Sequence, residues 1–433
     1  MEQTGKVKNV FTNKNFVLAF LGAFVSNMGN ILYSFAVSYY ILYLSDNNAL
    51  IQGLYLATGG ITFILVVLFG GVISDRFHKG KIMYTCDYLK GIILIAFTIL
   101  LMTIIKDNNS KITILFILAV IGNIIAAIFS PASSSLIPHI VPEESYQQAQ
   151  SYYSLMNSVQ SILGIVLAGV LYSVIPVNTL FIIVGGCYIV SGISEMFIRY
   201  NFVKPKDKLT IKTAFVDIKD AFKYVYNLKP IFYLIICILF VNFFFSPIFA
   251  NFMPYFISTD VATSNYLFND FLEPEMWNSI IVVFESIGSI GSAVVLSILK
   301  KKKHISRGLR ISFILVSAVS SLFVMFYLFF QHDIIDISFL LISMVFIMFS
   351  IGVIIVTINV PIGATLYTWV EKEKLGKVSS LVDIGSQGLI PLSNLLGGII
   401  ISGLGTGALL IGCAAGFTIM TVLIIISKQI GKL

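Results

Sequence analysis

Charged residues are scarce in this sequence. Only 11% of its 433 residues are Asp, Glu, Lys or Arg, whereas 57% are apolar and the mean hydropathy is +0.94. A soluble domain carries about 25% charged residues, because it must cover its surface with them. The composition therefore excludes a water-soluble globule, and a lipid bilayer is the solvent that suits the chain.

Cysteine and histidine are also scarce, and they are scattered. The four cysteines lie singly in or beside apolar runs and the four histidines lie in separate loops: Cys86, Cys187, Cys237, Cys413, His78, His139, His304 and His332. A disulfide framework or a metal site would need pairs or clusters of such residues. We therefore predict no metal and no disulfide.

Motifs for nucleotide chemistry and catalysis are missing as well. No phosphate-binding Gly-x-x-x-x-Gly-Lys-Ser/Thr pattern occurs, so ATP is not a direct energy source. No paired acids, Ser/His constellation or histidine cluster falls at one membrane depth, as a polytopic membrane enzyme would require. An enzyme stays only a distant alternative, and no cofactor is predicted.

Apolar runs long enough to cross a bilayer fill the chain. A transmembrane helix needs about 20 mostly apolar residues. The runs that qualify are 15–43, 51–74, 82–105, 112–130, 147–173, 177–199, 230–257, 277–299, 309–330, 337–367, 377–402 and 405–427. Period-2 alternation is absent, so these runs predict helices rather than barrel strands. We expect an all-α membrane protein with twelve transmembrane helices.

Basic residues gather on one side of this predicted topology. If the N-terminus is inside, only Lys106 and Lys111 of the 28 Lys and Arg residues fall in an outside loop, and Lys90 falls within the third span. The positive-inside rule then places both termini in the cytoplasm, in a multi-pass protein of the inner membrane. The net charge of +7 is accounted for by topology, so no nucleic-acid partner is predicted.

The chain divides into two related halves. A polar stretch at 200–229 separates a six-helix half at 1–199 from another at 230–433. This stretch predicts either an amphipathic helix on anionic headgroups or a plain linker. A shift of 229 residues aligns Val141 with Val370 and Gly169 with Gly398, which indicates a parallel repeat with pseudo-twofold symmetry. Transporters that are built from parallel repeats of this kind bind substrate near the bilayer midplane and work by rocking one half against the other.

A glycine- and charge-rich loop follows the second span. Gly71 precedes Asp75, Arg76 and a basic cluster that ends at Lys81. The pattern resembles the cytoplasmic loop signature of the major facilitator superfamily. The resemblance implies that Gly71 lets helices approach closely. It also implies that Asp75 meets the positive N-terminal end of a helix of the other half, and that this contact holds the cytoplasmic ends of the two halves together as a latch. The alternative is a basic turn that only sets topology. Asp383 pairs with this loop or faces headgroup-level water.

Further segments are similar to the branch of that family that contains macrolide and siderophore exporters. They are Ser130-Pro131-Ala132 through Ile137-Pro138, Val141-Pro142-Glu143, Ala149-Gln150-Ser151, Asn242 with Pro247 and Pro254, Leu375-Gly376-Lys377-Val378, Pro391 with Gly397-Gly398, and Asp87 with Lys90. The resemblance covers about residues 12–427 and implies an efflux antiporter of the multidrug-resistance type. One departure is that the fifth span keeps Gly164 and Gly169 but lacks the antiporters' proline.

Charged residues inside the spans are candidates for function, because such charges are costly in a bilayer. Glu285 in the eighth span is a candidate for proton or cationic-substrate coupling, or else it bonds to another helix. Asp87 is a second proton-coupling candidate, although Asp87 and Lys90, one turn apart, are expected chiefly to neutralise each other. Glu195 and Arg199, at the inner end of the sixth span, are likewise expected chiefly to neutralise each other.

Polar side chains on other spans are candidates for the substrate cavity. In the family that the sequence resembles, spans one, four, seven and ten line it. The candidates there are Asn27, Asn30, Tyr33, Asn123, Asn242 and Asn359, with Asn157 and Gln160 on span five. Each could instead provide hydrogen bonds between helices.

Taken with the 36 phenylalanines, these features favour transport of a bulky, lipophilic compound. We predict a monomeric secondary transporter that uses the proton gradient to export a macrolide-like drug or a secreted metabolite by alternating access. Its partners would be the small-molecule substrate, protons and membrane lipids. An importer or a lipid translocator on the same fold is the alternative.

Overall fold

A computed structural model gives the structure of the chain. It describes residues 10–142, 145–200, 202, 219, 222–298, 305–369 and 385–427. All regular structure in these ranges is helical, and twelve helices are long and apolar enough to cross a membrane. The predicted all-α membrane protein is therefore confirmed. The predicted amphipathic segment at 200–229 lies largely outside the described residues.

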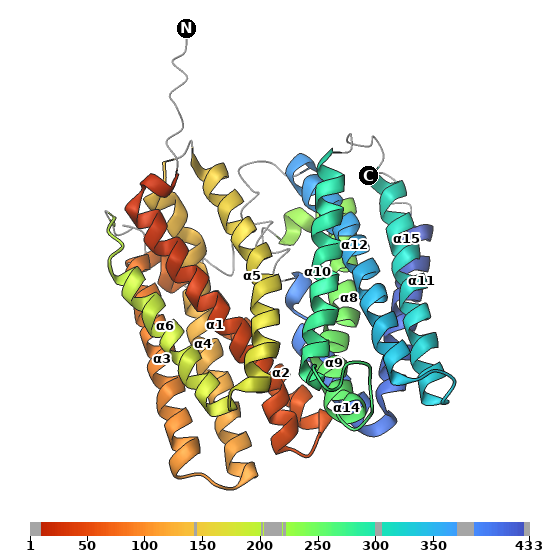
Figure 1. The fold of residues 1–433 in the computed structure, drawn as a ribbon. Coiled ribbons are helices and arrows are strands. Elements are labelled where there is room, and N and C mark those ends of the chain that lie inside the picture. Colours follow the sequence, from red (N-terminus) through yellow and green to blue (C-terminus); the bar gives the residue numbers. More distant parts are fainter. Residues whose placement is uncertain are drawn as a thin grey trace. The chain divides into compact units, whose positions relative to one another are not determined.

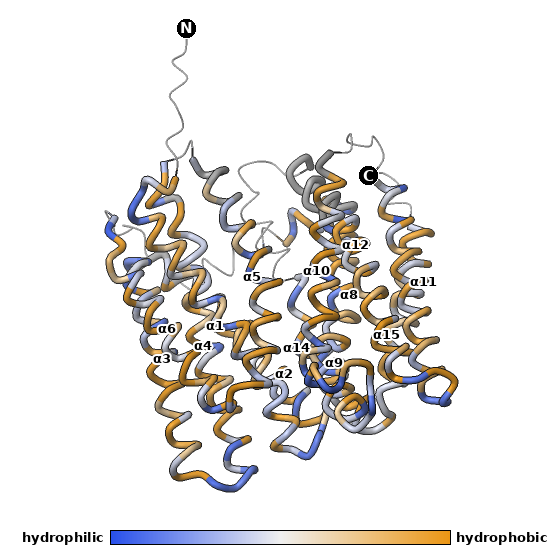
Figure 2. Tube along the Cα trace, viewed as in Figure 1, coloured by the Kyte–Doolittle hydropathy of each residue, from blue (hydrophilic) through white to orange (hydrophobic). Residues whose placement is uncertain are grey.

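The main helices follow the predicted spans closely. They are α1 (Lys14–Leu44), α2 (Ala49–Arg76), α3 (Lys79–Thr103), α4 (Asn108–Ile140), α5 (Tyr146–Val174), α6 (Val177–Met196), α8 (Lys229–Pro247), α10 (Pro274–Ile298), α11 (Ile305–Gln331), α12 (Ile337–Trp369), α14 (Ile390–Leu404) and α15 (Thr406–Ile426). Figure 1 shows their course, and Figure 2 shows hydrophobic residues along the helices with hydrophilic ones concentrated in the connecting loops.

The chain forms two compact units. Unit 1 comprises Met1–Tyr40 and Thr58–Ile211, and unit 2 comprises Ile41–Ala57 and Lys212–Leu433. The last turn of α1 and the first turns of α2 thus belong to unit 2. There Gln52 donates to the carbonyl of Ala250 at 3.2 Å, and a Cβ on Gly53 would lie 2.8 Å from the carbonyl of Asn394.

Glycines set the closest helix contacts of unit 1. The helices α3 and α6 touch where a Cβ on Gly91 would lie 2.7 Å from the carbonyl of Gly185. Gly70 of α2 lies against the backbone of Ala127 in α4, whereas Gly71 has nothing within 4 Å of where its Cβ would stand. The close approach expected at Gly71 is therefore made by Gly70, because neighbouring residues on a helix face different directions.

Helix α4 extends well beyond its predicted end. The predicted span ends at residue 130, but α4 continues through Ile140. Ser135 donates its hydroxyl to the carbonyl of Pro131 at 2.6 Å, and Leu136 and Ile140 lie in a buried apolar cluster. The serines lower the local hydropathy without ending the helix, because their hydroxyls bond to the helix's own backbone.

The seventh span is irregular in its outer part. After α8 the chain passes through a π-helical turn (η3, Ile248–Phe252), a short helix (α9, Met253–Phe256) and a second π-helical turn (η4, Ile257–Val261). Pro247 and Pro254 each remove a backbone donor, which explains why regular α-helical hydrogen bonding is interrupted.

Candidate functional site

Unit 1 contains a polar cavity of about 560 Å³. Five helices contribute to its lining, from α1 to α5. Four of the predicted cavity residues lie there, namely Asn27, Asn30, Asn123 and Asn157, together with Asp87 and Lys90. Serines of the extended part of α4 complete the lining, Ser130, Ser133 and Ser134 among them. The cavity therefore combines many hydrogen-bonding groups with both an acid and a base.

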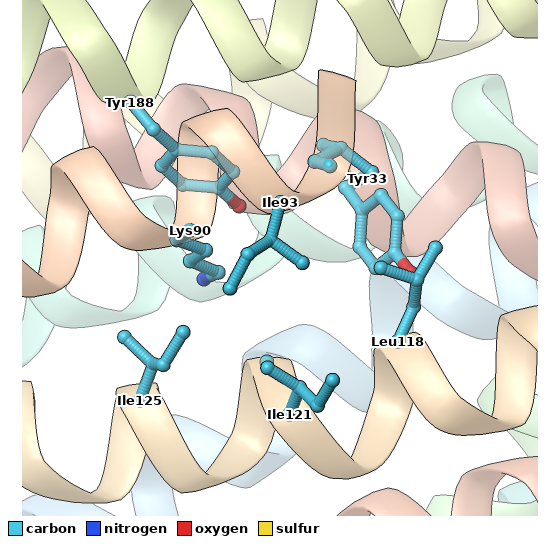
Figure 3. A pocket seen from close by; sticks show the side chains of 9 residues that line it. Tyr33, Lys90, Ile93, Leu118, Ile121, Ile125 and Tyr188 are labelled. Carbon is cyan, nitrogen blue, oxygen red and sulfur yellow. The ribbon is translucent and has the colours of Figure 1, made fainter. Parts of the chain in front are cut away.

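Lys90 is held by neutral partners. Its ammonium donates to Oδ1 of Asn30 at 2.6 Å and lies 4.4 Å from the centre of the Tyr188 ring. The Tyr188 hydroxyl donates to the same Asn30 oxygen at 2.7 Å. Figure 3 shows Lys90 and Tyr188 at a small adjoining pocket, with Tyr33 on its wall. Tyr33 thus lines this pocket rather than the larger cavity.

The charges of Asp87 and Lys90 act on each other, but their mutual neutralisation stays a prediction. No ion pair within 4.0 Å joins them in the part of the chain that the structure describes, and the Lys90 ammonium donates to Asn30. The expected pairing of Glu195 with Arg199 is wrong, because Glu195 is 0% exposed and Arg199 is exposed. The Arg199 backbone instead exchanges hydrogen bonds with the Asn15 side chain, at 2.6 and 3.0 Å.

Unit 2 contains a smaller and more apolar cavity of about 250 Å³. Three of the predicted residues line it: Asn242 of α8, Glu285 of α10 and Asn359 of α12. The other lining residues are Ile238, Val241, Phe245, Phe249, Val282, Ile355 and Ile358. Glu285 is the ionisable side chain among them. A ligand in this cavity would meet hydrocarbon, two amides and one carboxyl group.

Close packing of α10 on α12 positions Glu285. A Cβ on Gly352 would overlap the backbone carbonyl of Glu285, and one on Gly288 would overlap that of Phe349. The Ser289 hydroxyl lies 3.1 Å from both Oε1 of Glu285 and the carbonyl of Gly352. The half-buried carboxyl group thus lies on a closely packed helix pair, with two serine hydroxyls beside it.

Some predicted residues have a structural role or lie elsewhere. Gln160 is 2% exposed and donates to the carbonyl of Phe24 at 2.6 Å, so it joins α5 to α1 and does not line the cavity. Asn242 lines its cavity and also donates to the carbonyl of Ser386 at 3.1 Å. Asp383 lies outside the described residues, as do the side chains of Asp75 and Arg76.

Lys81 is exposed in the first turn of α3. Its backbone N–H donates to Nδ1 of His78, the N-cap of that helix, at 3.3 Å. Partial burial, followed by the charge of Lys81, lowers the pKa of His78 below its ordinary 6.5. The imidazole ring is therefore held in the neutral form, which can accept the capping hydrogen bond.

Curated relatives match about half of the chain. The MFS-type transporter YkuC of Bacillus subtilis (strain 168) is 24% identical over 51% of this chain and 52% of its own length. The staphyloferrin A transporter of Staphylococcus aureus (strain NCTC 8325 / PS 47) is 22% identical over 43% of this chain and 47% of its own length. The chain thus aligns with about half the length of each.

Solved structures match the whole fold. A bacterial homologue of the iron transporter ferroportin has a TM-score of 0.69 at 14% identity, covering 95% of this chain and 98% of that one. The D-xylose–proton symporter has a TM-score of 0.69 at 13% identity, covering 96% and 97%. These relatives and neighbours are transporters, so the prediction that the protein is not an enzyme is confirmed.

A family-level match spans most of the chain. The model of the Major Facilitator Superfamily matches residues 19–362, from α1 through most of α12. Together with the twelve long apolar helices in the described ranges, this match establishes a multi-pass integral membrane protein. The chain belongs to the Major Facilitator Superfamily.

Proposed function

We propose that the protein is a proton-coupled secondary exporter of a bulky, lipophilic compound. Family membership supplies the secondary transport, and the unit 2 cavity carries the finer proposal. Its walls are Ile, Val and Phe side chains, with Glu285 as the ionisable group on them. A cavity of this kind accepts an apolar ligand and offers one place for a proton or a positive charge.

The chemistry of Glu285 supports exchange of protons for substrate. A carboxylate in an apolar cavity is costly unless a cation or a proton neutralises it. Entry of a lipophilic cation would displace the proton, and release of the cation would restore it. Because both neutralise the same group, proton and substrate exclude each other, which is the condition for antiport.

The relatives suggest which substrates to test. The sequence resemblance points to macrolides and siderophores, and one curated relative is named a staphyloferrin A transporter. One structural neighbour is named a proton symporter, which supports proton coupling on this fold and keeps import as the alternative. We therefore place a macrolide first and a siderophore second.

The gating latch completes the proposal. Gly71, Asp75, Arg76, Lys81 and Asp383 would close the cytoplasmic side during alternating access. The protein would work as a monomer in the inner membrane, with both termini in the cytoplasm. The asymmetric placement of Lys and Arg in the sequence supports this orientation.

Accumulation of a radiolabelled macrolide in expressing cells tests the proposal. Cells with the wild-type protein should accumulate less label than empty-vector cells, and a protonophore should remove the difference. Glu285→Gln should abolish protonophore-sensitive export, whereas the matched variant Glu273→Gln, at an exposed acid before α10, should behave as wild type.

Two results would decide against parts of this scheme. Equal accumulation with and without the protein would reject macrolides, and the assay would be repeated with a labelled siderophore. Accumulation above the empty-vector control would reverse the direction and establish the importer.

A further inference from the structure

Glu195, near the end of α6, is an ionisable residue that the proposed export mechanism leaves unused. Its side chain is 0% exposed, and neither carboxyl oxygen has a hydrogen-bond partner among the described residues. The nearby basic residue Arg199 points to the exterior and does not neutralise it. Buried polar groups without partners are rare and need an explanation.

A second buried acid lies beside Glu195. The helices α3 and α6 pack against each other, and the charge of Asp87 on α3 acts directly on Glu195. Asp87 is 4% exposed, and its Oδ2 also lacks a partner. Room for the Glu195 side chain comes from α1, where a Cβ on Gly22 would lie 3.0 Å from Cγ of Glu195. Three helices thus enclose the two acids.

The other titratable groups around the two acids come from α3, α5 and α6. They are Cys86 and Lys90 on α3, Tyr153 on α5 and Tyr188 on α6. The positive charge of Lys90 acts on Asp87, although the Lys90 ammonium itself is hydrogen-bonded to Asn30. Glu195 has no such support, because its oxygens meet no donor among the described residues. An ionised state is therefore easier for Asp87 than for Glu195.

Two buried carboxylates that act on each other cannot both be ionised at moderate cost. One proton on the pair removes most of that cost, and Glu195 is the better place for it, since it has no compensating partner. The pair therefore binds and releases protons as one unit.

Access to the pair runs through Asp87. Asp87 lines the unit 1 cavity, whereas Glu195 is fully buried and is not among the residues that line it. The Ser191 hydroxyl donates its proton to the carbonyl of Gly22 at 2.8 Å, so it is not a donor to either acid. A proton from water in the cavity can bond to an Asp87 oxygen. It can then pass to a Glu195 oxygen, which leaves Asp87 ionised again.

We propose that Asp87 and Glu195 form a proton-binding site in unit 1, in which Asp87 exchanges protons with the cavity and Glu195 stores the proton. The use of this proton in transport rests on the proposed function, but its binding does not. Glu195 is thereby a proton-coupling residue that complements Glu285 in unit 2.

Infrared difference spectroscopy of the purified full-length protein in lipid nanodiscs tests the site. Protonated carboxyl groups give a carbonyl stretching band that ionised ones lack, so spectra at acidic and alkaline pH are compared. In a Glu285→Gln background, Glu195→Gln should remove one carboxyl band, and Asp87→Asn should remove a second and shift the band of Glu195. Glu273→Gln, at an exposed acid of unit 2, should leave these bands unchanged.

Labelling of glutamate with carbon-13 at the side-chain carboxyl provides a readout that needs no substitution at Glu195. In the Glu285→Gln background, the band assigned to Glu195 should shift with the label. If no buried glutamate band exists, or if Asp87→Asn leaves that band unchanged, the acid pair is rejected.

A transport measurement separates this inference from the proposed function. In proteoliposomes, Glu195→Gln should retain exchange of labelled macrolide across the membrane but lose accumulation driven by a pH gradient. If the wild-type protein moves no macrolide, the proposed function fails, and the infrared bands still decide whether the pair binds a proton. Retained gradient-driven accumulation in Glu195→Gln would show that the stored proton is not coupled to transport.

Discussion

The cavities of the two units differ in the polar and ionisable groups that line them. The unit 1 cavity is lined by asparagines and serines and contains both Asp87 and Lys90, and the charge of Asp87 acts on the buried Glu195. The unit 2 cavity is mostly hydrocarbon, with Glu285 as its ionisable group. In unit 1, Asn30 and Tyr188 share the contacts of the Lys90 ammonium, whereas in unit 2 one carboxyl group depends on two serine hydroxyls.

The difference extends to how the helices are held. In unit 2, α10 and α12 meet backbone to backbone at Gly288 and Gly352, so Glu285 lies on a tightly packed pair. In unit 1, hydrogen bonds such as those of Asn30 fix the groups around the cavity. A packed surface tolerates no added volume, while a hydrogen-bonded network is sensitive to the loss of one partner.

The largest effect on stability is expected from filling the glycine contact of unit 2. Gly352→Ala adds a methyl group where the carbonyl of Glu285 lies, and overpacking of this kind costs about 1–3 kcal/mol. The control is Gly291→Ala on α10, where nothing lies within 4 Å of the added Cβ. Thermal unfolding in detergent measures both. Equal melting temperatures for the two variants would show that α10 and α12 are not held by this contact.

A smaller difference in stability is expected between the alanine variants of two asparagines, one in each cavity. Asn30→Ala leaves the half-buried Lys90 ammonium without its acceptor, which costs about 1–3 kcal/mol. Asn242→Ala removes a neutral bond to the carbonyl of Ser386, which costs about 1 kcal/mol. Denaturant unfolding in mixed micelles compares them. A larger loss for Asn242→Ala would overturn the view that unit 1 depends more on its polar network.

The smallest expected effect is a pH dependence of stability that comes from His78 at the start of α3. The pKa of His78 is lower in the folded protein than its ordinary 6.5, so folding favours the neutral ring. The stabilisation is complete above pH 6.5 and is lost as the pH falls through that value toward the lower folded pKa. Loss of a cap costs about 1 kcal/mol.

A capping residue that does not titrate provides the control for His78. His78→Asn keeps a side-chain acceptor at the N-cap at every pH, so its melting temperature should fall less than that of the wild type below pH 6.5. Parallel curves for the two proteins would mean that the His78 cap contributes nothing measurable.

Some features of the sites could be predicted from sequence because they depend on single residues. A carboxyl group amid apolar neighbours marked Glu285, and asparagines on predicted spans marked Asn27, Asn123 and Asn359, all of which line cavities. Intramembrane polarity is visible in a sequence, since burial in lipid makes each polar residue exceptional.

Other features of the sites could not be predicted from sequence, because they depend on contacts between residues that are distant along the chain. Glu195 was assigned to Arg199, four residues away, because local spacing is what a sequence shows. In the structure its neighbours are Asp87 and Gly22 from other helices. The displacement of the close contact from Gly71 to Gly70 has the same origin, because the rotation of a helix about its axis is set by packing.

The sequence by itself determined that the chain is a membrane protein of the Major Facilitator Superfamily, with twelve membrane-crossing helices in the ranges that the structure describes, since hydrophobic length and loop motifs are local properties. Only the tertiary structure decided which charges are neutralised. Lys90 is held by Asn30 and Tyr188, and Glu195 is left with Asp87. The reason is physical: the cost of a buried charge depends on the groups that surround it in space, and those groups come from different helices.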